Sequence, residues 1–473
     1  MTEAKFRIER DSIGEKEIPA DAYYGINAAR GAENFTITGR LIHKELIIAL
    51  AEVKKACAIS NFEAGIMTEE VKDAIVQASD EIIAGKLHDQ FICDPIQGGA
   101  GTTANMNANE VIANRANEIL GGKLGAYDKV NANDHVNMGQ STNDAFPTAG
   151  KIAALKLGEK TVNELRKLYD ALLEKSKEFD HVIKMGRTHL QDAVPIRLGQ
   201  EFHAYSSVVK RLADNLDYAL DAIRVVNMGA SAVGTGINVD TGYLKVIVPN
   251  LNKVIDLGLI QTDDLVDGTQ SLDGFVVVSS ALKTAAVSLS KMCNDFRLMA
   301  SGPRCGFGEI NLPERQAGSS IMPGKVNPVI AEVMSQVAFN IIGNDMAVTM
   351  AAEAGQLQLN VFEPVLFYNL YESIETLGNG VATLRENLVV GVTANEERCK
   401  SLVDNSVGTI TAIVPHVGYK NAANIAKKAI KSGEPVRKIA IAEGLLTKEE
   451  LDEILDPFAL TEPGIAAKHL LEK

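Results

Sequence analysis

Residues 151–179, "KIAALKLGEKTVNELRKLYDALLEKSKEF", carry the pattern that decides the fold. Apolar side chains recur in this stretch at spacings of three, four and seven residues, which places them on one face of a helix. The stripe consists of Ile152, Leu155, Val162, Leu165, Leu168 and Leu172. The pattern therefore predicts one long helix that buries this face.

The same helical periodicity occurs in later segments of the chain, which are separated by stretches without it. One stripe consists of Tyr205, Val209, Leu212, Leu216, Leu220 and Ile223, and another of Val278, Leu282, Ala285, Leu289, Met292, Phe296 and Met299. The segments 328–355 and 364–395 are also rich in helix-forming residues. We therefore expect five long helices between residues 141 and 395, in a mainly α protein.

These helices have more apolar surface than one chain easily covers, so we expect the chain to associate with copies of itself. An intramolecular bundle is the alternative that periodicity leaves open. We expect three domains. Residues 1–140 form a mixed, mostly helical domain of short helices and glycine-rich turns. Residues 141–396 form the long-helix bundle, and 397–473 a small helical domain with a capping box at Thr447 and Glu450.

Composition excludes several classes of function. The chain has 473 residues, 46% of them apolar, and a net charge of -14, which argues against nucleic acid and anionic membrane surfaces as partners. Its five cysteines form no C-x-x-C pair, so neither a disulfide framework nor a structural zinc site is expected. The charged N-terminal stretch lacks the apolar core of a secretory signal. We expect a cytoplasmic protein without a membrane anchor.

One segment interrupts the helical pattern. Residues 301–328, "SGPRCGFGEINLPERQAGSSIMPGKVNP", hold five glycines and four prolines and no helical stripe. Gly324 and Lys325 resemble the end of a phosphate-binding loop, but that motif also needs a Ser or Thr where Val326 stands. A long loop between two strong helices is usually functional. We therefore expect a lid, hinged at Gly318 and Gly324, that closes over a site.

Three other stretches combine hydrogen-bonding side chains with a weak helical stripe: "DPIQGGAGTTANMNANE" (94–110), "HVNMGQSTNDAFPT" (135–148) and "MGRTHLQDAVP" (185–195). Taken singly, such residues usually cap helices or close turns, His189 would be a structural histidine, and Lys325 a solvated surface charge. Taken together, hydroxyl, amide and ammonium donors without a metal motif predict a pocket for a small dicarboxylate.

Six blocks of the chain resemble the aspartase/fumarase superfamily, in that family's order and across nearly the whole sequence. They are "GAGTTANMNANEVIANRA", "QSTNDAFPTA", "GRTHLQDAVP", "SAVGTGIN", "SGPRCGFGEI" and "GSSIMPGKVNP". Within the superfamily, "DPIQGGAGT" and "VNMGQSTND" resemble the ammonia-lyase branch. The resemblance implies an aspartase/fumarase-like fold and a homotetramer whose central helices form one bundle, with each active site shared between three subunits.

The resemblance also implies a reaction, the reversible elimination of ammonia from L-aspartate to give fumarate. Ser319 would be the base, and Thr102, Ser141 and Thr142, with the loop amides and Ser320, would bind the carboxylate that gains charge. Lys325 and Asn327 would bind the other carboxylate, while Asn143, Thr188 and His189 would surround the amino group. Glu332 would pair with His189. No cofactor is implied, although some family members respond to divalent metal ions.

Two alternatives to an ammonia-lyase stay open at this stage: a class II fumarase, which would expel water, and a structural homologue that has lost its activity. The chain also departs from the family pattern at two places. Asn27 and Ala28 in "GINAAR" stand where Gln and Thr are usual, so no substrate contact is assigned to Arg30. Gly139 stands where Ser is common, beside the expected site.

Overall fold

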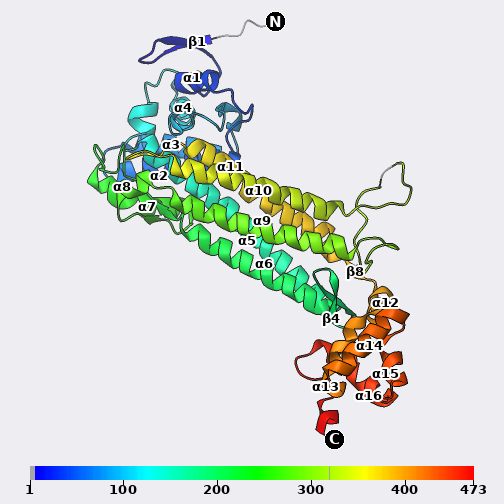
Figure 1. The fold of residues 1–473 in the computed structure, drawn as a ribbon. Helices are drawn as coiled ribbons and strands as arrows, with labels where there is room; N and C mark the ends of the chain where they lie inside the picture. The colour runs from blue at the N-terminus through cyan, green and yellow to red at the C-terminus, as the bar shows by residue number, and fades with distance from the viewer. Residues whose placement is uncertain (1–5, 319, 473) are drawn as a thin grey trace. The chain divides into compact units, whose positions relative to one another are not determined.

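The computed structural model describes residues 6–318 and 320–472 and confirms a mainly α fold. All five predicted long helices are present (Figure 1). They are α5 (Thr142–Glu178), α6 (Leu198–Asp221), α9 (Asp273–Met299), α10 (Val329–Glu353) and α11 (Glu363–Asn387).

The described chain divides into two compact units. The first comprises the described residues up to Asn163 together with Ala213–Ala286 and Val337–Asn379. The second comprises Glu164–Leu212, Val287–Gln336 and the described residues from Gly380. Because the boundaries between the units fall inside the long helices, the expected division into three domains stays a prediction.

In the first unit, parts of three long helices pack through aromatic side chains. The ring of Phe367 on α11 lies 5.4 Å from that of Phe146 on α5 and 5.2 Å from that of Phe275 on α9. All three side chains are buried. The other elements of this unit are β1 (Phe6–Arg10), β2 (Glu15–Pro19), α1 (Ile26–Asn34), α2 (Lys44–Glu63), α3 (Glu69–Ile83), α4 (Thr102–Ile119), a π-helical turn (Ala132–Val136), β5 (Val225–Val226), α7 (Thr241–Ile255), β6 (Ile260–Gln261) and α8 (Leu265–Gln270).

The helices before residue 140 are longer than predicted: α2 has 20 residues and α4 has 18. Both lack a clear stripe because they are buried on most of their circumference, and α4 buries several asparagines where an apolar stripe would be expected. A helix buried all round has no polar face to give it an amphipathic period.

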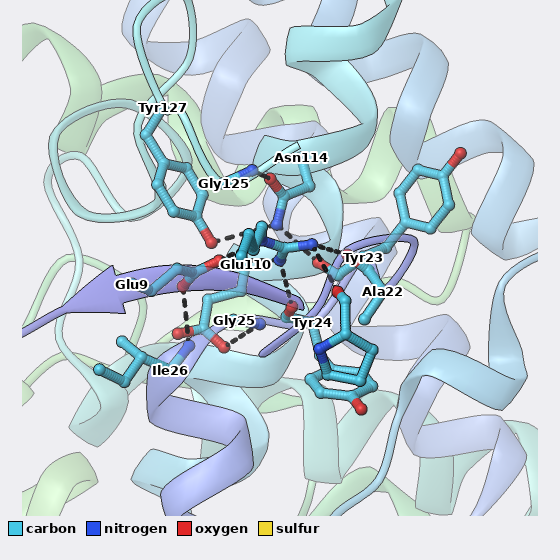
Figure 2. A network of polar contacts seen from close by, with 12 residues as sticks. Glu9, Ala22, Tyr23, Tyr24, Gly25, Ile26, Glu110, Asn114, Gly125 and Tyr127 are labelled. Carbon is cyan, nitrogen blue, oxygen red and sulfur yellow. Dashed lines mark hydrogen bonds and ion pairs between the residues drawn. The ribbon is translucent and has the colours of Figure 1, made fainter. Parts of the chain in front are cut away.

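Helix α1 begins without a capping side chain of its own, because Gly25 holds the N-cap position. The carboxylate of Glu110, on α4, accepts from the backbone nitrogens of Gly25, Asn27 and Ala28 at 2.8–3.1 Å. Glu9 accepts from the backbone nitrogen of Ile26 at 2.9 Å; Figure 2 shows this contact and that of Glu110 with Gly25. Carboxylates at this end also complement the helix dipole.

In the second unit, β3 (Ile183–Thr188) and β4 (Gln191–Arg197) form an antiparallel hairpin. The ring of Phe202 on α6 lies 5.1 Å from that of Phe179 and 5.6 Å from that of Phe296 on α9. The capping box of Thr447 and Glu450 is present, as predicted. The other elements are β7 (Ile310–Asn311), β8 (Thr393–Ala394), α12 (Glu396–Asn405), α13 (Ile410–Val417), α14 (Tyr419–Ser432), α15 (Val436–Ala442) and α16 (Lys448–Ile454).

Two of the long helices have unusual surfaces. Among the described helices, α9 is the one long and apolar enough to cross a membrane by length and composition. However, 56% of its apolar 18-residue stretch is buried inside the protein, as expected of a core helix. On α10, Phe339 is 64% exposed, and Met346 and Met350 are each 63% exposed. Spacings of seven and four residues place these three side chains on one face.

Candidate active site

Four of the predicted site residues lie at the N-termini of two helices in the first unit. Thr102 is the first residue of α4, Ser141 precedes α5, and Thr142 and Asn143 open α5. Gly101 allows the close approach of the two helices, because a methyl group there would overlap the ring of Phe146 on α5, and its φ of +87° also favours glycine. Two helix N-termini side by side favour an anion.

Asp144 holds the segment of Ser141 in place. One carboxylate oxygen accepts from the backbone nitrogen of Ser141 at 2.8 Å, and the other accepts from those of Gly229 and Ser231, each at 3.1 Å. Asn143 donates its side-chain amide to the carbonyl of Ala232 at 2.8 Å. Burial raises the pKa of Asp144 to about 6, although the backbone donors and the Lys54 ammonium oppose that shift.

A buried lysine lies beneath this group, and the sequence analysis did not find it. Lys54, on α2, is fully buried and donates to the side-chain oxygens of Asn105 at 2.7 Å, Gln140 at 2.7 Å and Asn137 at 3.1 Å. Asn105 in turn donates to the hydroxyl of Thr142 at 3.2 Å. Burial lowers the pKa of Lys54 to about 8. A lysine inside the apolar run "ELIIALAEVKKACAI" was the available signal.

The second group begins at the tip of the β3–β4 hairpin. Thr188 pairs with Gln191, so His189 and Leu190 form a two-residue turn. Their φ values are +55° and +59°, as a type I′ turn requires, although glycine and asparagine normally fill such positions. Thr188, His189 and Leu190 are all exposed. The hairpin therefore presents its predicted site residues at a strained tip.

The remaining predicted residues lie in the loop before α10 and at the start of that helix. Ser320 and Lys325 are exposed, Asn327 and Glu332 are half-buried, and Glu332 lies in the first turn of α10. The base of the loop is tight, because a methyl group on Gly318 would overlap the carbonyl oxygen of Lys325. Ser319 lies outside the described residues.

The structure thus brings Thr102, Ser141, Thr142 and Asn143 together at two helix ends. Within the described part of one chain, no hydrogen bond joins His189 to Glu332. Their pairing, and the individual roles of all the site residues, stay predictions.

Comparison with known proteins identifies the class. The profile of a family described as "Lyase" matches residues 14–343, and that of "Fumarase C C-terminus" matches 410–462. The first match covers more than half of the chain, which therefore belongs to this lyase family. Within the family, several curated relatives that match nearly the whole length are aspartate ammonia-lyases, members of the aspartase/fumarase superfamily.

The individual relatives agree with this placement. Aspartate ammonia-lyase of Bacillus subtilis is 55% identical over 99% of both chains, and that of Escherichia coli is 46% identical over 99% of this chain and 98% of the relative. A fumarate lyase:delta crystallin from Brucella melitensis has a TM-score of 0.95 at 47% identity, covering 97% of this chain and 100% of that one. A class II fumarase from Schistosoma mansoni has a TM-score of 0.93 at 35% identity, with the same coverage.

Proposed function

We propose that the protein is an aspartate ammonia-lyase, a carbon–nitrogen lyase that reversibly converts L-aspartate to fumarate and ammonia. The observation that carries the proposal is the 46–55% identity to curated aspartate ammonia-lyases over nearly the whole chain. The two helix N-termini that carry Thr102 and Thr142 supply donors of the kind that a dicarboxylate substrate needs.

The chemistry of the elimination explains why hydrogen-bond donors predominate among the proposed site residues. The proton to be removed lies on the carbon beside the side-chain carboxylate, and its loss places a second negative charge on that carboxylate. Such a proton is very weakly acidic, so the rate depends on stabilising the dianionic aci-carboxylate. Each well-placed donor contributes about 3 kcal/mol, on the order of 100-fold in rate.

Ser319 is the proposed base, and its alkoxide needs stabilisation by the donors of the surrounding loop. Thr102, Ser141, Thr142 and Ser320 bind the carboxylate that gains charge; for Thr102 this requires its hydroxyl to turn away from the carbonyl of Gly99, to which it donates at 2.6 Å. The second carboxylate pairs with Lys325 and Asn327. Around the amino group lie Asn143, Thr188 and His189, with Glu332 orienting the imidazole.

We further propose a cytoplasmic homotetramer in which three chains contribute to each site. The exposed apolar face of Phe339, Met346 and Met350 on α10 supports association, because apolar patches of this kind usually mark protein contacts. The proposed elimination needs no cofactor.

The test of the reaction is to incubate the purified protein with L-aspartate and, separately, with L-malate while following the ultraviolet absorbance of fumarate. We expect turnover of aspartate. Turnover of malate alone would replace the ammonia-lyase by a fumarase.

The test of the base is Ser319→Ala. This variant should lose turnover while its sedimentation matches that of the wild type, because the change removes one hydroxyl. Full activity in Ser319→Ala would remove the assignment of the base.

A further inference from the structure

The orientation of the Asn105 side chain is fixed by Lys54. An ammonium group only donates hydrogen bonds, so the atom of Asn105 that lies 2.7 Å from Nζ of Lys54 must be the amide oxygen. The amide nitrogen of Asn105 then donates to the hydroxyl of Thr142 at 3.2 Å and to the side-chain oxygen of Asn137 at 3.3 Å. Both Lys54 and Asn105 are almost completely buried, which leaves this arrangement little freedom.

Lys54 also orients the segment that leads to Thr142. The side-chain oxygens of Asn137 and Gln140 accept from the same ammonium, and the amide nitrogen of Asn137 donates to the carbonyl of Gln140 at 3.1 Å. The ammonium therefore uses its three protons on three amide oxygens. Each of these amides is left with its nitrogen directed elsewhere.

The proton of the Thr142 hydroxyl is available for a hydrogen bond to a ligand. Its oxygen accepts from Asn105, so its proton must point to another acceptor. Within residues 6–318 and 320–472, the hydrogen bonds include none that this hydroxyl donates. Thr142 is half-buried in the first turn of α5, where its proton can reach a bound anion.

We propose that Lys54 is a positioning residue for the elimination: acting through Asn105, it forces the Thr142 hydroxyl to donate its proton to the substrate carboxylate that gains charge. The proposal rests on the proposed function and deepens it. Lys54 itself does not touch substrate. The effect is larger in the transition state than in the ground state, because the carboxylate oxygens carry more charge there.

The central test is Asn105→Asp. The variant keeps the shape of the side chain and keeps an oxygen for Lys54, but it places a second oxygen opposite Thr142. That hydroxyl would then donate to the introduced carboxylate and be lost to the substrate. We expect kcat to fall on the order of 100-fold, with a smaller change in KM, because one transition-state donor is removed.

Thr142→Val removes the same donor directly, so the losses of kcat caused by the two substitutions should not multiply. We expect the double variant to be no slower than Thr142→Val alone, a coupling that a general loss of stability would not produce. Losses that multiply would overturn the proposal. An Asn105→Asp enzyme whose kcat stays within about threefold of the wild-type value would also overturn it, if Thr142→Val has lost activity. So would a Thr142→Val enzyme with full activity.

Lys54→Met gives an independent route if Asn105→Asp does not assemble. It should show the same coupling with Thr142→Val, and independent losses would overturn the proposal. Its matched control is Lys55→Met. Lys55 is the next residue along α2, but it pairs with Asp80 at 2.6 Å, and that variant should keep wild-type kcat and KM. Failure of the proposed function would look different, because the wild-type protein itself would then form no fumarate from aspartate.

Discussion

The Nη1 atom of Arg187 lies 2.8 Å from the Oε1 atom of Glu309, whose side chain is fully buried. Lys184 approaches the other oxygen of that carboxylate at 3.1 Å. Both cations belong to β3, the strand that ends at Thr188, and Glu309 belongs to the segment that leads toward the 318–328 loop. One buried carboxylate therefore ties the hairpin that carries His189 to that segment.

Glu309→Gln should destabilise the second unit strongly. The amide keeps the shape but removes the carboxylate partner of the buried Arg187, while Lys184 keeps a second carboxylate, Glu201, at 2.9 Å. Breaking a buried ion pair costs about 3–5 kcal/mol. Urea unfolding should report the loss. The control is Glu396→Gln, which removes an exposed pair with His181 and should change stability by less than about 1 kcal/mol. Equal effects of the two variants would contradict this view of Glu309.

Leu190→Gly should stabilise the folded protein. Leu190 has a φ of +59°, a conformation that costs an L-residue about 1–2 kcal/mol and glycine almost nothing. The measurement is the free energy of unfolding. Leu190→Ala is the control, since alanine keeps the Cβ atom and should gain nothing. If both variants were destabilised instead, the leucine side chain would have to make a stabilising contact in the assembly.

Activity should be greatest between about pH 6 and pH 8. Burial raises the pKa of Asp144 to about 6, so the carboxylate that holds Ser141 becomes protonated below that pH. Burial lowers the pKa of Lys54 to about 8, so the ammonium loses a proton, and one hydrogen bond, above that pH. Between the two values both groups are charged.

The fall of activity at acid pH can be assigned with the variant Asp144→Asn, whose side chain cannot titrate. This variant should have a lower kcat/KM than wild type at pH 7 and no further fall near pH 6. An unchanged fall at acid pH in Asp144→Asn would assign it to another group.

Phe339→Glu combined with Met346→Glu should dissociate the assembly. Both side chains are exposed in the single chain and would place charges in a buried contact between copies. Sedimentation velocity should show smaller particles, and activity should fall with them if several chains build each site. Tyr419→Glu changes an 81% exposed residue in the C-terminal part of the chain and serves as the control. A full-sized particle from the double variant would exclude this face from the contact.

Three of the long helices could be predicted because each has one buried stripe, and the other two because their segments are rich in helix-forming residues. Leu155, Leu165 and Leu168 are all fully buried, as the spacing requires. The breaks between the stripes also indicated the loop before α10. The signal is local in each case: the residues that produce it lie within a few turns of one another.

The hydrogen bonds that hold the site residues in place could not be predicted in this way. Lys54, Asn105 and Gln140 meet only because three separate segments pack together, and their spacing in the sequence has no period. A buried asparagine on α4 also looks the same in sequence as one that caps a turn. Its role follows from its partners, which the tertiary structure supplies.

The capping of α1 by Glu110 has a consequence for synthesis. Glu110, which accepts from the backbone nitrogens of Gly25, Asn27 and Ala28, lies 85 residues further along the chain than Gly25. Until Glu110 has been released by the ribosome, the segment Ile26–Asn34 has only the contact of Glu9 with Ile26 at its first turn, and a helix of nine residues is too short to persist alone in water. The N-terminal end of the protein is therefore completed late, once α4 has emerged and folded back on it.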